Sequence, residues 1–433
     1  MSEPGNSPVV GTAGVSPRLK RLLYFAVALF LAHQVFYLSI YKPMTIFGVD
    51  YGKHWKAAVA VLEGRSVYTG LPLGDPRKDV SLYDSELWMG FNYPQWTAFT
   101  FVWLGFFTQA VAEKVWKLFL LACVAACWLL AWRALRPADI DESLLGPEDR
   151  AVRAGVRSHW WLTTVVVTMA FMPAVSALYI GNIDPYNALL AVAMIAALAG
   201  GRPRLAGAIW AMLTLVKLLP VALVVPVFFW RRWKVLAGFA GVMVFYLLLL
   251  AVTGRLGQEW FLYHDMLPLV PYYWRGISFT PVRAVLDLTG YGELWHVQKY
   301  FEVIVRAQGI VFGAAYVAFL YWFRKRGADW MRGLEVAILL YVIVTPLLEY
   351  HHFVYVMPVI YLQLRRWAEG RMNWTAAGGL LFGWILLQIG FIVSFQLSNI
   401  KHIHFVSTLA YFVIVGFTLY DALKHLPNRP IQA

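Results

Sequence analysis

Apolar stretches close to 20 residues long recur from one end of this chain to the other, and they limit its fold more than any motif does. They cover residues 21–40, 113–132, 160–180, 186–200, 234–252, 303–323, 374–396 and 404–421. A helix needs about 20 apolar residues to cross a bilayer, and inside lipid it satisfies its own backbone hydrogen bonds. Because 60% of the residues are hydrophobic and 14% are charged, we predict an all-α polytopic membrane protein.

The positive charge lies in short clusters between the apolar stretches, which argues against a nucleic-acid-binding face. The formal net charge is +13. The clusters are Arg18/Lys20/Arg21, 133–157, Arg202/Arg204, Arg231/Arg232/Lys234, 324–326, Arg365/Arg366 and Lys424/Arg429. Cytoplasmic loops are enriched in Lys and Arg, so we place all the clusters in the cytoplasm. About twelve crossings with both termini inside give this arrangement, and no nucleic-acid partner is expected.

Three segments are predicted to cross the membrane incompletely. Residues 205–230 have basic flanks and a Pro near Lys217, and they indicate a re-entrant or broken hairpin. Residues 92–109 are diluted by polar side chains and favour a dipping or interfacial helix. A full crossing there would invert every later segment and place the basic clusters outside. Residues 334–348 and 353–365 indicate two short spans that flank a polar apex at 349–352.

The domain organisation follows from these spans. Residues 1–17 are rich in Gly, Ser and Pro and are expected to form a disordered cytoplasmic N-terminus. The first span is long and has no small-residue cleavage site after it, so we interpret it as an anchor rather than a removed signal peptide. Residues 18–425 form one transmembrane domain with outer loops at 41–91 and 253–302, and 426–433 form a cytoplasmic tail.

Polar side chains from distant parts of the sequence fall on the predicted outer face. They are Asp50, Lys53, His54, Asp184, His264, Asp265, Arg275, Arg283, Glu349, His351, His352, His402 and His404. Acids, bases and cations at one membrane depth are expected where a lipid-borne anionic substrate meets a polar acceptor. Asp50 also fits a simple N-cap, and Lys217 fits either a snorkelling side chain or a phosphate contact.

The remaining polar residues also have two interpretations. Residues 181–185 read as a tight turn between spans, although Asn182 is free for a further role. Two His and a Glu in Glu349-Tyr350-His351-His352 are costly in a membrane unless they are paired or wetted. Their spacing gives only a weak zinc pattern, so we expect no metal and no cofactor. The aromatic Tyr93, Trp274 and Tyr350 are candidates to line a sugar pocket.

A series of short motifs resembles glycosyltransferase family 87. In order they are Val49-Asp50, 61–64, Val67-Tyr68, 91–94, 181–183, Ala206-Gly207, 216–220, Thr345-Pro346 and His351-His352. The family holds bacterial polyprenyl-phosphate-mannose-dependent mannosyltransferases of the GT-C fold, including the alpha-1,2-mannosyltransferase of phosphatidylinositol mannoside synthesis. The resemblance covers roughly residues 20–370. It implies a GT-C-like bundle with a long first outer loop and short re-entrant helices.

The resemblance also implies an inverting sugar transfer at the outer face of the bacterial inner membrane. The donor would be a polyprenyl-phosphate-linked sugar, with mannose favoured, and the acceptor a glycolipid or glycan hydroxyl. Asp50 corresponds to the catalytic base. Lys217, His351, His352 and Arg283 are candidates for the donor phosphate, and the acceptor or sugar pocket is expected among His54, Tyr93, Asn182, Glu349 and Trp274.

The chain departs from the family pattern at Gln95, at Asn182 and at 278–281, which concerns the sugar and acceptor rather than the reaction class. Two other function classes fit the composition. A transporter or flippase of lipid-linked sugars would also have broken helices and buried charge, and internal inverted repeats would favour it. A non-catalytic membrane assembly subunit is the other alternative, and the convergent polar residues argue against it.

Overall fold

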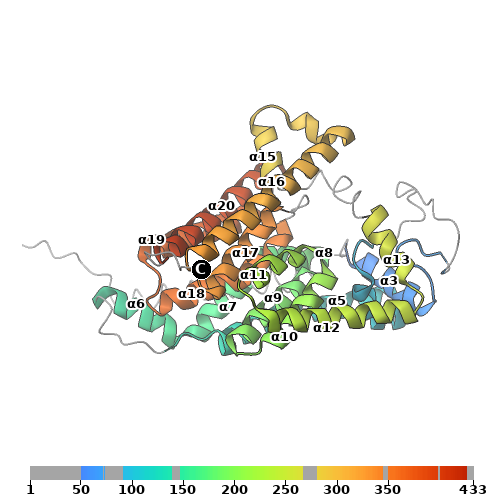
Figure 1. Ribbon diagram of the computed structural model, residues 1–433, viewed down its shortest axis with the longest axis horizontal. Helices are drawn as coiled ribbons and strands as arrows, with labels where there is room; N and C mark the ends of the chain where they lie inside the picture. The colour runs from blue at the N-terminus through green and yellow to red at the C-terminus, as the bar shows by residue number, and fades with distance from the viewer. Residues whose placement is uncertain are drawn as a thin grey trace, which may run out of the picture.

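The computed structural model describes residues 50–71, 73, 91–138, 147–266, 280–344, 350–397 and 400–426. These residues form helices and turns, and no strand occurs among them, as the apolar segments predict. The expected disordered N-terminus, the first span and the C-terminal tail lie outside the described residues. Helix α12 (Trp233–Val252) runs along the longest axis of the molecule, and α16 (Gln298–Lys325) and α20 (Ile400–Lys424) are inclined to it; α3 (Tyr51–Leu62) and α13 (Leu256–Phe261) lie at one end and α6 (Pro147–Ser158) at the other (Figure 1).

Within the described residues, four helices are long and apolar enough to cross a bilayer: α5 (Gln109–Ala134), α12 (Trp233–Val252), α16 (Gln298–Lys325) and the Val406–Lys424 part of α20 (Ile400–Lys424). A fifth crossing arises if α7 (Trp160–Met169) and α8 (Met172–Ile180), which meet at 48°, count as one span. About twelve crossings are therefore not confirmed. The predicted span 160–180 is thus divided into two helices, whereas those at 186–200 and 334–348 correspond to the short single helices α9 (Asp184–Ala199) and α17 (Trp330–Val344).

The break expected within 205–230 near Lys217 is found, and whether the segment forms a re-entrant hairpin stays a prediction. Helix α10 (Pro203–Val216) ends at Lys217, whose backbone is extended at φ −143° and ψ 129°. The chain continues into the 3-10 helix η4 (Leu219–Leu223) and helix α11 (Val224–Phe229). Pro220 at the start of η4 cannot donate a backbone hydrogen bond, so the α-helix cannot run through this point. The break leaves Lys217 at the end of a helix inside the bundle.

Residues 92–109 form two short helices, α4 (Gln95–Thr100) and η2 (Val102–Phe106), which are too short to span a bilayer. This agrees with the predicted dipping segment. Helix α3 (Tyr51–Leu62) packs against η2, and its Trp55 donates to the Phe107 carbonyl at 3.1 Å. The segment from α3 to η2 therefore rests on the bundle rather than extending from it.

A buried carboxylate fixes this segment to α13 (Leu256–Phe261). Glu259 Oε2 accepts hydrogen bonds from the Tyr68 hydroxyl at 3.3 Å and from the Gln95 backbone N–H at 3.2 Å. Glu259 is 5% exposed, and a buried carboxylate needs such donors to offset its desolvation. Three sequence-distant segments therefore meet at one side chain.

Two glycines allow α10 and α12 to cross in close contact. A Cβ at Gly207 would lie 1.9 Å from the Val235 carbonyl oxygen, and one at Gly238 would lie 2.0 Å from the Arg204 carbonyl oxygen. Small residues at such crossings let helix backbones approach in membranes. Because α10 carries Lys217 at its end, this crossing also sets where that ammonium lies.

The other helices complete the bundle and its two ends. They are α6 (Pro147–Ser158), η5 (Leu262–Met266), α15 (Pro281–Leu288), η7 (Gly292–His296), η8 (Tyr350–Val356), α18 (Met357–Ala368) and α19 (Trp374–Leu397). Arg366 of α18 pairs with Glu335 of α17 and lies 3.8 Å from Asp421 of α20. These ion pairs tie α17, α18 and α20 together at the end of the bundle that carries the arginine clusters, which we call the basic end.

Candidate active site

The ends of four helical segments meet around one group of polar side chains. Asp50 precedes α3, residues 181–184 join α8 to α9, Lys217 ends α10, and His351 lies in η8. A backbone hydrogen bond of 2.9 Å from Asp50 N to the Ile180 carbonyl joins the first two. The segments are up to 301 residues apart in sequence, from 50 to 351, and the predicted convergence of Asp50, Asn182, Lys217 and His351 is found.

The carboxylate of Asp50 does not cap its helix. Asp50 occupies the N-cap position of α3, but its side chain makes no capping hydrogen bond. One oxygen accepts from Lys53 Nζ at 3.0 Å and the other from Asn182 Nδ2 at 2.6 Å. The side chain is 19% exposed. The carboxylate is therefore held by residues of the site, and the simple N-cap interpretation fails.

The ionised form of Asp50 is favoured by its neighbours rather than by exposure to water. Burial by itself would raise the pKa of Asp50, but the charges of Lys53 and His351 and the hydrogen bond from Asn182 outweigh it and hold that pKa well below its usual range. Burial likewise acts to lower the pKa of Lys53, and Tyr93 and Asp50 raise it instead. The two side chains are an ion pair at neutral pH.

A tight turn orients Asn182 between two acids. Gly181 ends α8 at φ 71°, a left-handed conformation that favours glycine. The Asn182 side chain donates to Asp50, and its oxygen accepts from the backbone N–H of Asp184 at 3.1 Å. The turn predicted at 181–185 is confirmed, and Asn182 has the further contact that the sequence left open.

Asp184 is the centre of the second half of the site. It is fully buried, and Lys217 Nζ lies 2.7 Å from one of its oxygens and 2.9 Å from the other. Asn187 donates to it at 2.8 Å, and His351 Nε2 lies 3.5 Å away. A buried charge requires such partners. Asp184 therefore positions Lys217 and His351 beside each other.

Three residues of this region have the ligand atoms for a metal ion. Side-chain atoms of Asp184, His351 and His352 all lie within 4.8 Å of one another, and the two His rings are 4.6 Å apart between centroids. Both carboxylate oxygens of Asp184 already contact the Lys217 ammonium. A divalent cation would have to displace that ammonium, so the donor set suits a cationic side chain better than a metal.

His54 lies one helical turn beyond Asp50 in an aromatic pocket. Its ring centroid is 5.1 Å from that of Tyr93 and 5.0 Å from that of Trp116. It is 1% exposed, and neither ring nitrogen has a hydrogen-bond partner within the described part of the chain. Burial and the nearby Lys53 charge lower the pKa of His54 to about 3. His54 is therefore neutral at pH 7 and offers one donor and one acceptor.

The other predicted site residues are not brought into this cluster. Arg283 lies on α15, 3.6 Å from Asp287 of the same helix, and α15 is far from α3 in Figure 1. Glu349 and Trp274 lie outside the described residues. Of the predicted phosphate contacts, Lys217, His351 and His352 are thus the ones found beside the Asp50 region.

Two residues of the cluster were absent from the predicted site. Lys53 is three positions after Asp50, a spacing that places both side chains on one helix face. Asp184 follows Asn182 by two positions at the start of a helix. Both were recognisable as outer-face polar residues, but the sequence does not show which charges pair.

Comparison with known proteins gives one family match, and it covers part of this site. The model of glycosyltransferase family 87 matches residues 91–346. A search of curated proteins gives no match to the chain. The matched region contains Asn182, Asp184 and Lys217, whereas Asp50 and His351 lie outside it.

Proposed function

The chain belongs to glycosyltransferase family 87, and on that premise we propose that it transfers a sugar, with mannose favoured, from a polyprenyl-phosphate donor to a glycolipid or glycan hydroxyl. Membership makes it a glycosyltransferase. The donor class is supported by the helical architecture, because the described residues include no domain suited to a sugar nucleotide. Apolar spans beside a polar cluster suit a donor whose carrier is itself a lipid.

The reaction is a direct displacement with inversion. The acceptor oxygen forms a bond to the anomeric carbon as the bond from that carbon to the phosphate oxygen breaks. The acceptor proton moves to Asp50, and the electron pair of the broken bond stays on the lipid phosphate. Asp50 is ionised and lies within the cluster, so it can accept a proton, and its low pKa must rise as substrate loosens its contact with Lys53 for it to act as an effective base. Asn182 orients its carboxylate.

The departing phosphate needs positive charge, because its charge increases as the bond to the sugar breaks. Lys217 is the cation for this role, and His351 and His352 supply further donors near it. Asp184 neutralises Lys217 in the absence of substrate. Asn182 thus lies between the proposed base, Asp50, and the proposed phosphate contacts around Lys217. His54 and Tyr93 are assigned to the sugar or acceptor pocket.

The observation that carries this proposal is the short contact chain from Asp50 through Asn182 to Asp184 and Lys217. Asn182 and Asp184 thus link a base to a cation within one contact chain, as expected for a substrate that loses a proton at one end and releases a phosphate at the other. A flippase has broken helices too, and α10 is broken, but moving a lipid requires no base.

The test uses the purified full chain with radiolabelled polyprenyl-phosphate-mannose and a lipid acceptor extract. We expect Asp50→Asn to lower kcat by about 10²- to 10⁴-fold, the usual contribution of a general base, with donor binding retained. Lys217→Met should lower kcat and, unlike Asp50→Asn, should also weaken donor binding. Glu63→Gln, at the half-exposed far end of α3, is the matched control and should be unchanged.

Each outcome has a meaning for the function. Normal transfer by Asp50→Asn removes Asp50 as the base. Scrambling of the labelled donor across vesicles without any sugar transfer by the wild type would replace the transferase with a flippase. Equal transfer from other polyprenyl-phosphate sugars would support the proposed reaction but would contradict the preference for mannose.

A further inference from the structure

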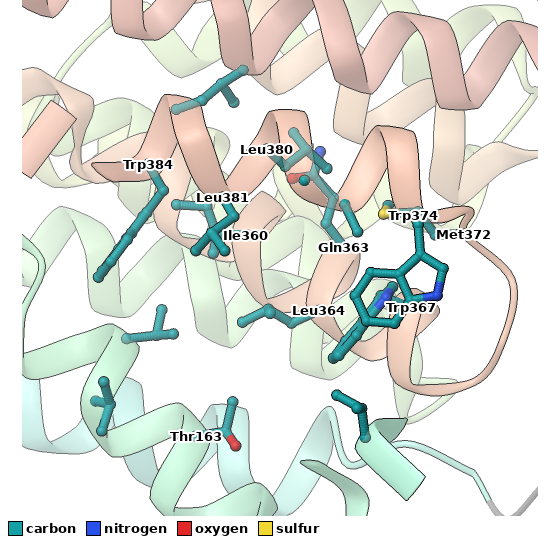
Figure 2. A pocket seen from close by; sticks show the side chains of 16 residues that line it. Thr163, Ile360, Gln363, Leu364, Trp367, Met372, Trp374, Leu380, Leu381 and Trp384 are labelled. Atoms are coloured by element: carbon teal, nitrogen blue, oxygen red, sulfur yellow. The ribbon is translucent and has the colours of Figure 1, made fainter. Parts of the chain in front are cut away.

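An apolar cavity lies among α6, α7, α18 and α19, and Figure 2 shows the side chains that line it. Its volume is about 480 Å³, within the range of cavities that hold small ligands. Helix α18 begins next to η8, and Trp367, which lines the cavity, is ten residues further along this helix. At 1.5 Å per residue, roughly 15 Å of helix separates it from the site end.

The wall of this cavity is almost entirely hydrocarbon. Val166, Leu364, Leu381 and Trp384 are among the lining residues. The two polar lining side chains are already satisfied: the Thr163 hydroxyl donates to the His159 carbonyl at 3.3 Å, and Gln363 donates to Thr418. An apolar cavity of this kind binds apolar groups and excludes water.

Two tryptophans indicate that one end of this cavity lies where lipid chains meet their headgroups. Trp367 and Trp374 line this end, and Trp side chains concentrate at the membrane interface. Trp384 lines the cavity about 15 Å further along α19. The indole N–H groups of Trp367 and Trp384 have no acceptor within the described residues. An ester-linked acyl chain carries both the hydrocarbon that fits the wall and carbonyl oxygens that accept from such donors.

The rim of the cavity has a net positive charge. The two stretches 147–159 and 365–371 contain six arginines and three acidic residues, Glu148, Asp149 and Glu369. Arg153 donates to the Trp367 and Met372 carbonyls and lies over the Trp367 and Trp374 rings at 5.5 and 5.8 Å. Arg150 is exposed, and the Arg371 side chain, which lies 3.4 Å from Glu369, is 67% exposed. Clusters of this kind attract anionic lipid headgroups.

We propose that this cavity binds one acyl chain of an anionic phospholipid of the surrounding bilayer, with the headgroup phosphate at the arginine rim. The chain fills the apolar space between α7 and α19, and the headgroup meets Arg150 and Arg371. Because Val152 of α6 lines the same cavity, the bound lipid packs the amphipathic helix α6 against the bundle. This site is separate from the proposed sugar transfer and does not depend on it.

The test fills the cavity without disturbing its wall. Gly378 lines the cavity, and a Cβ there meets nothing within 4 Å, so Gly378→Leu places a side chain in the space of the lipid. Gly313 of α16 is also open within 4 Å and lies outside the cavity, so Gly313→Leu is the matched control. Full-chain protein, stripped of lipid in detergent, is titrated with phosphatidylglycerol while thermal unfolding and retained lipid are measured.

We expect phosphatidylglycerol to raise the unfolding midpoint of the wild type and of Gly313→Leu. The apparent affinity of Gly378→Leu should fall about tenfold, because its side chain displaces about two methylene groups of the lipid. Arg150→Gln combined with Arg371→Gln should remove the preference for phosphatidylglycerol over phosphatidylcholine. Unchanged affinity in Gly378→Leu, or equal stabilisation of the wild type by both lipids, would overturn the proposal.

A photoactivatable phosphatidylglycerol with a diazirine in its acyl chain gives a measurement that does not depend on folding of a variant. In the wild type we expect crosslinks on peptides from α18 and α19. Crosslinks confined to other helices would show that another occupant, such as a segment of this chain outside the described residues, fills the cavity.

Discussion

At the scale of single residues, the site shows how far side-chain chemistry can be predicted without coordinates. Asp50, Asn182, Lys217 and His351 converge as their residue types and outer-face positions predict. Lys53 and Asp184 determine the charge of those residues, yet nothing in the sequence separates a paired acid from a free one. Pairing depends on which helix ends meet, and that follows from packing of the whole bundle.

The ion pair between Lys53 and Asp50 predicts a pH effect. The active form of a base is ionised, and the low pKa of Asp50 keeps it ionised down to acidic pH. Lys53→Met removes the nearest positive charge, so the pKa of Asp50 rises. We expect the acidic limb of the kcat/KM profile to move upward by about 1 to 3 pH units.

Lys56→Met is the control for this profile. Lys56 lies on the same helix and is exposed, so its removal changes the helix charge equally without touching Asp50. An identical profile in the wild type and in Lys53→Met would show that another group sets the acidic limb.

At the scale of helices, the sequence predicts where a helix breaks better than it predicts how many helices are long enough to cross the membrane. Pro220 beside Lys217 indicates a break, and α10 ends there. Counting apolar residues over the whole chain suggests about twelve spans, whereas in the part of the chain that the structure describes four helices, or five with the bent pair, meet the length expected of a span. Apolar length alone does not show where a segment bends, because bending is set by the neighbours it packs against.

The close crossing of α10 and α12 predicts a large effect of one methyl group. Gly207→Ala places a Cβ 1.9 Å from the Val235 carbonyl oxygen, so the helices must separate. We expect a loss of about 1–3 kcal/mol of stability, typical of overpacking, and weaker donor use because Lys217 shifts. Thermal unfolding in detergent measures the first effect.

Gly241→Ala on α12 is the matched substitution. A Cβ there meets nothing within 4 Å, and alanine is a better helix former than glycine. The thermal unfolding midpoint of Gly241→Ala should therefore equal or exceed that of the wild type. Equal midpoints for both variants would contradict a close helix crossing at Gly207.

At the scale of the whole molecule, the distribution of charge predicts which end faces the cytoplasm. The described arginine clusters fall at helix ends opposite to Asp50 and α3, as the positive-inside rule requires for an outer active site. The family match covers 91–346 and so spans both ends. Orientation is a property of the assembled chain, which is why no single motif reveals it.

Cysteine labelling tests this orientation. Cys123 and Cys127 are both buried, so they contribute little background. In right-side-out vesicles an impermeant maleimide should label Thr289→Cys, which is exposed near the α15 end. Ser158→Cys, exposed near the basic end, should be labelled after permeabilisation. The reverse pattern would place Asp50 in the cytoplasm.

The contact between Lys53 and Asp50 also bears on a competing reaction. Water is a much smaller nucleophile than a sugar hydroxyl and enters an empty site freely. On the proposed mechanism, a water molecule that enters while the ammonium holds the carboxylate would meet a weak proton acceptor. An alcohol that moves the lysine aside would free the carboxylate, so the pair that keeps Asp50 charged would also favour sugar transfer over hydrolysis.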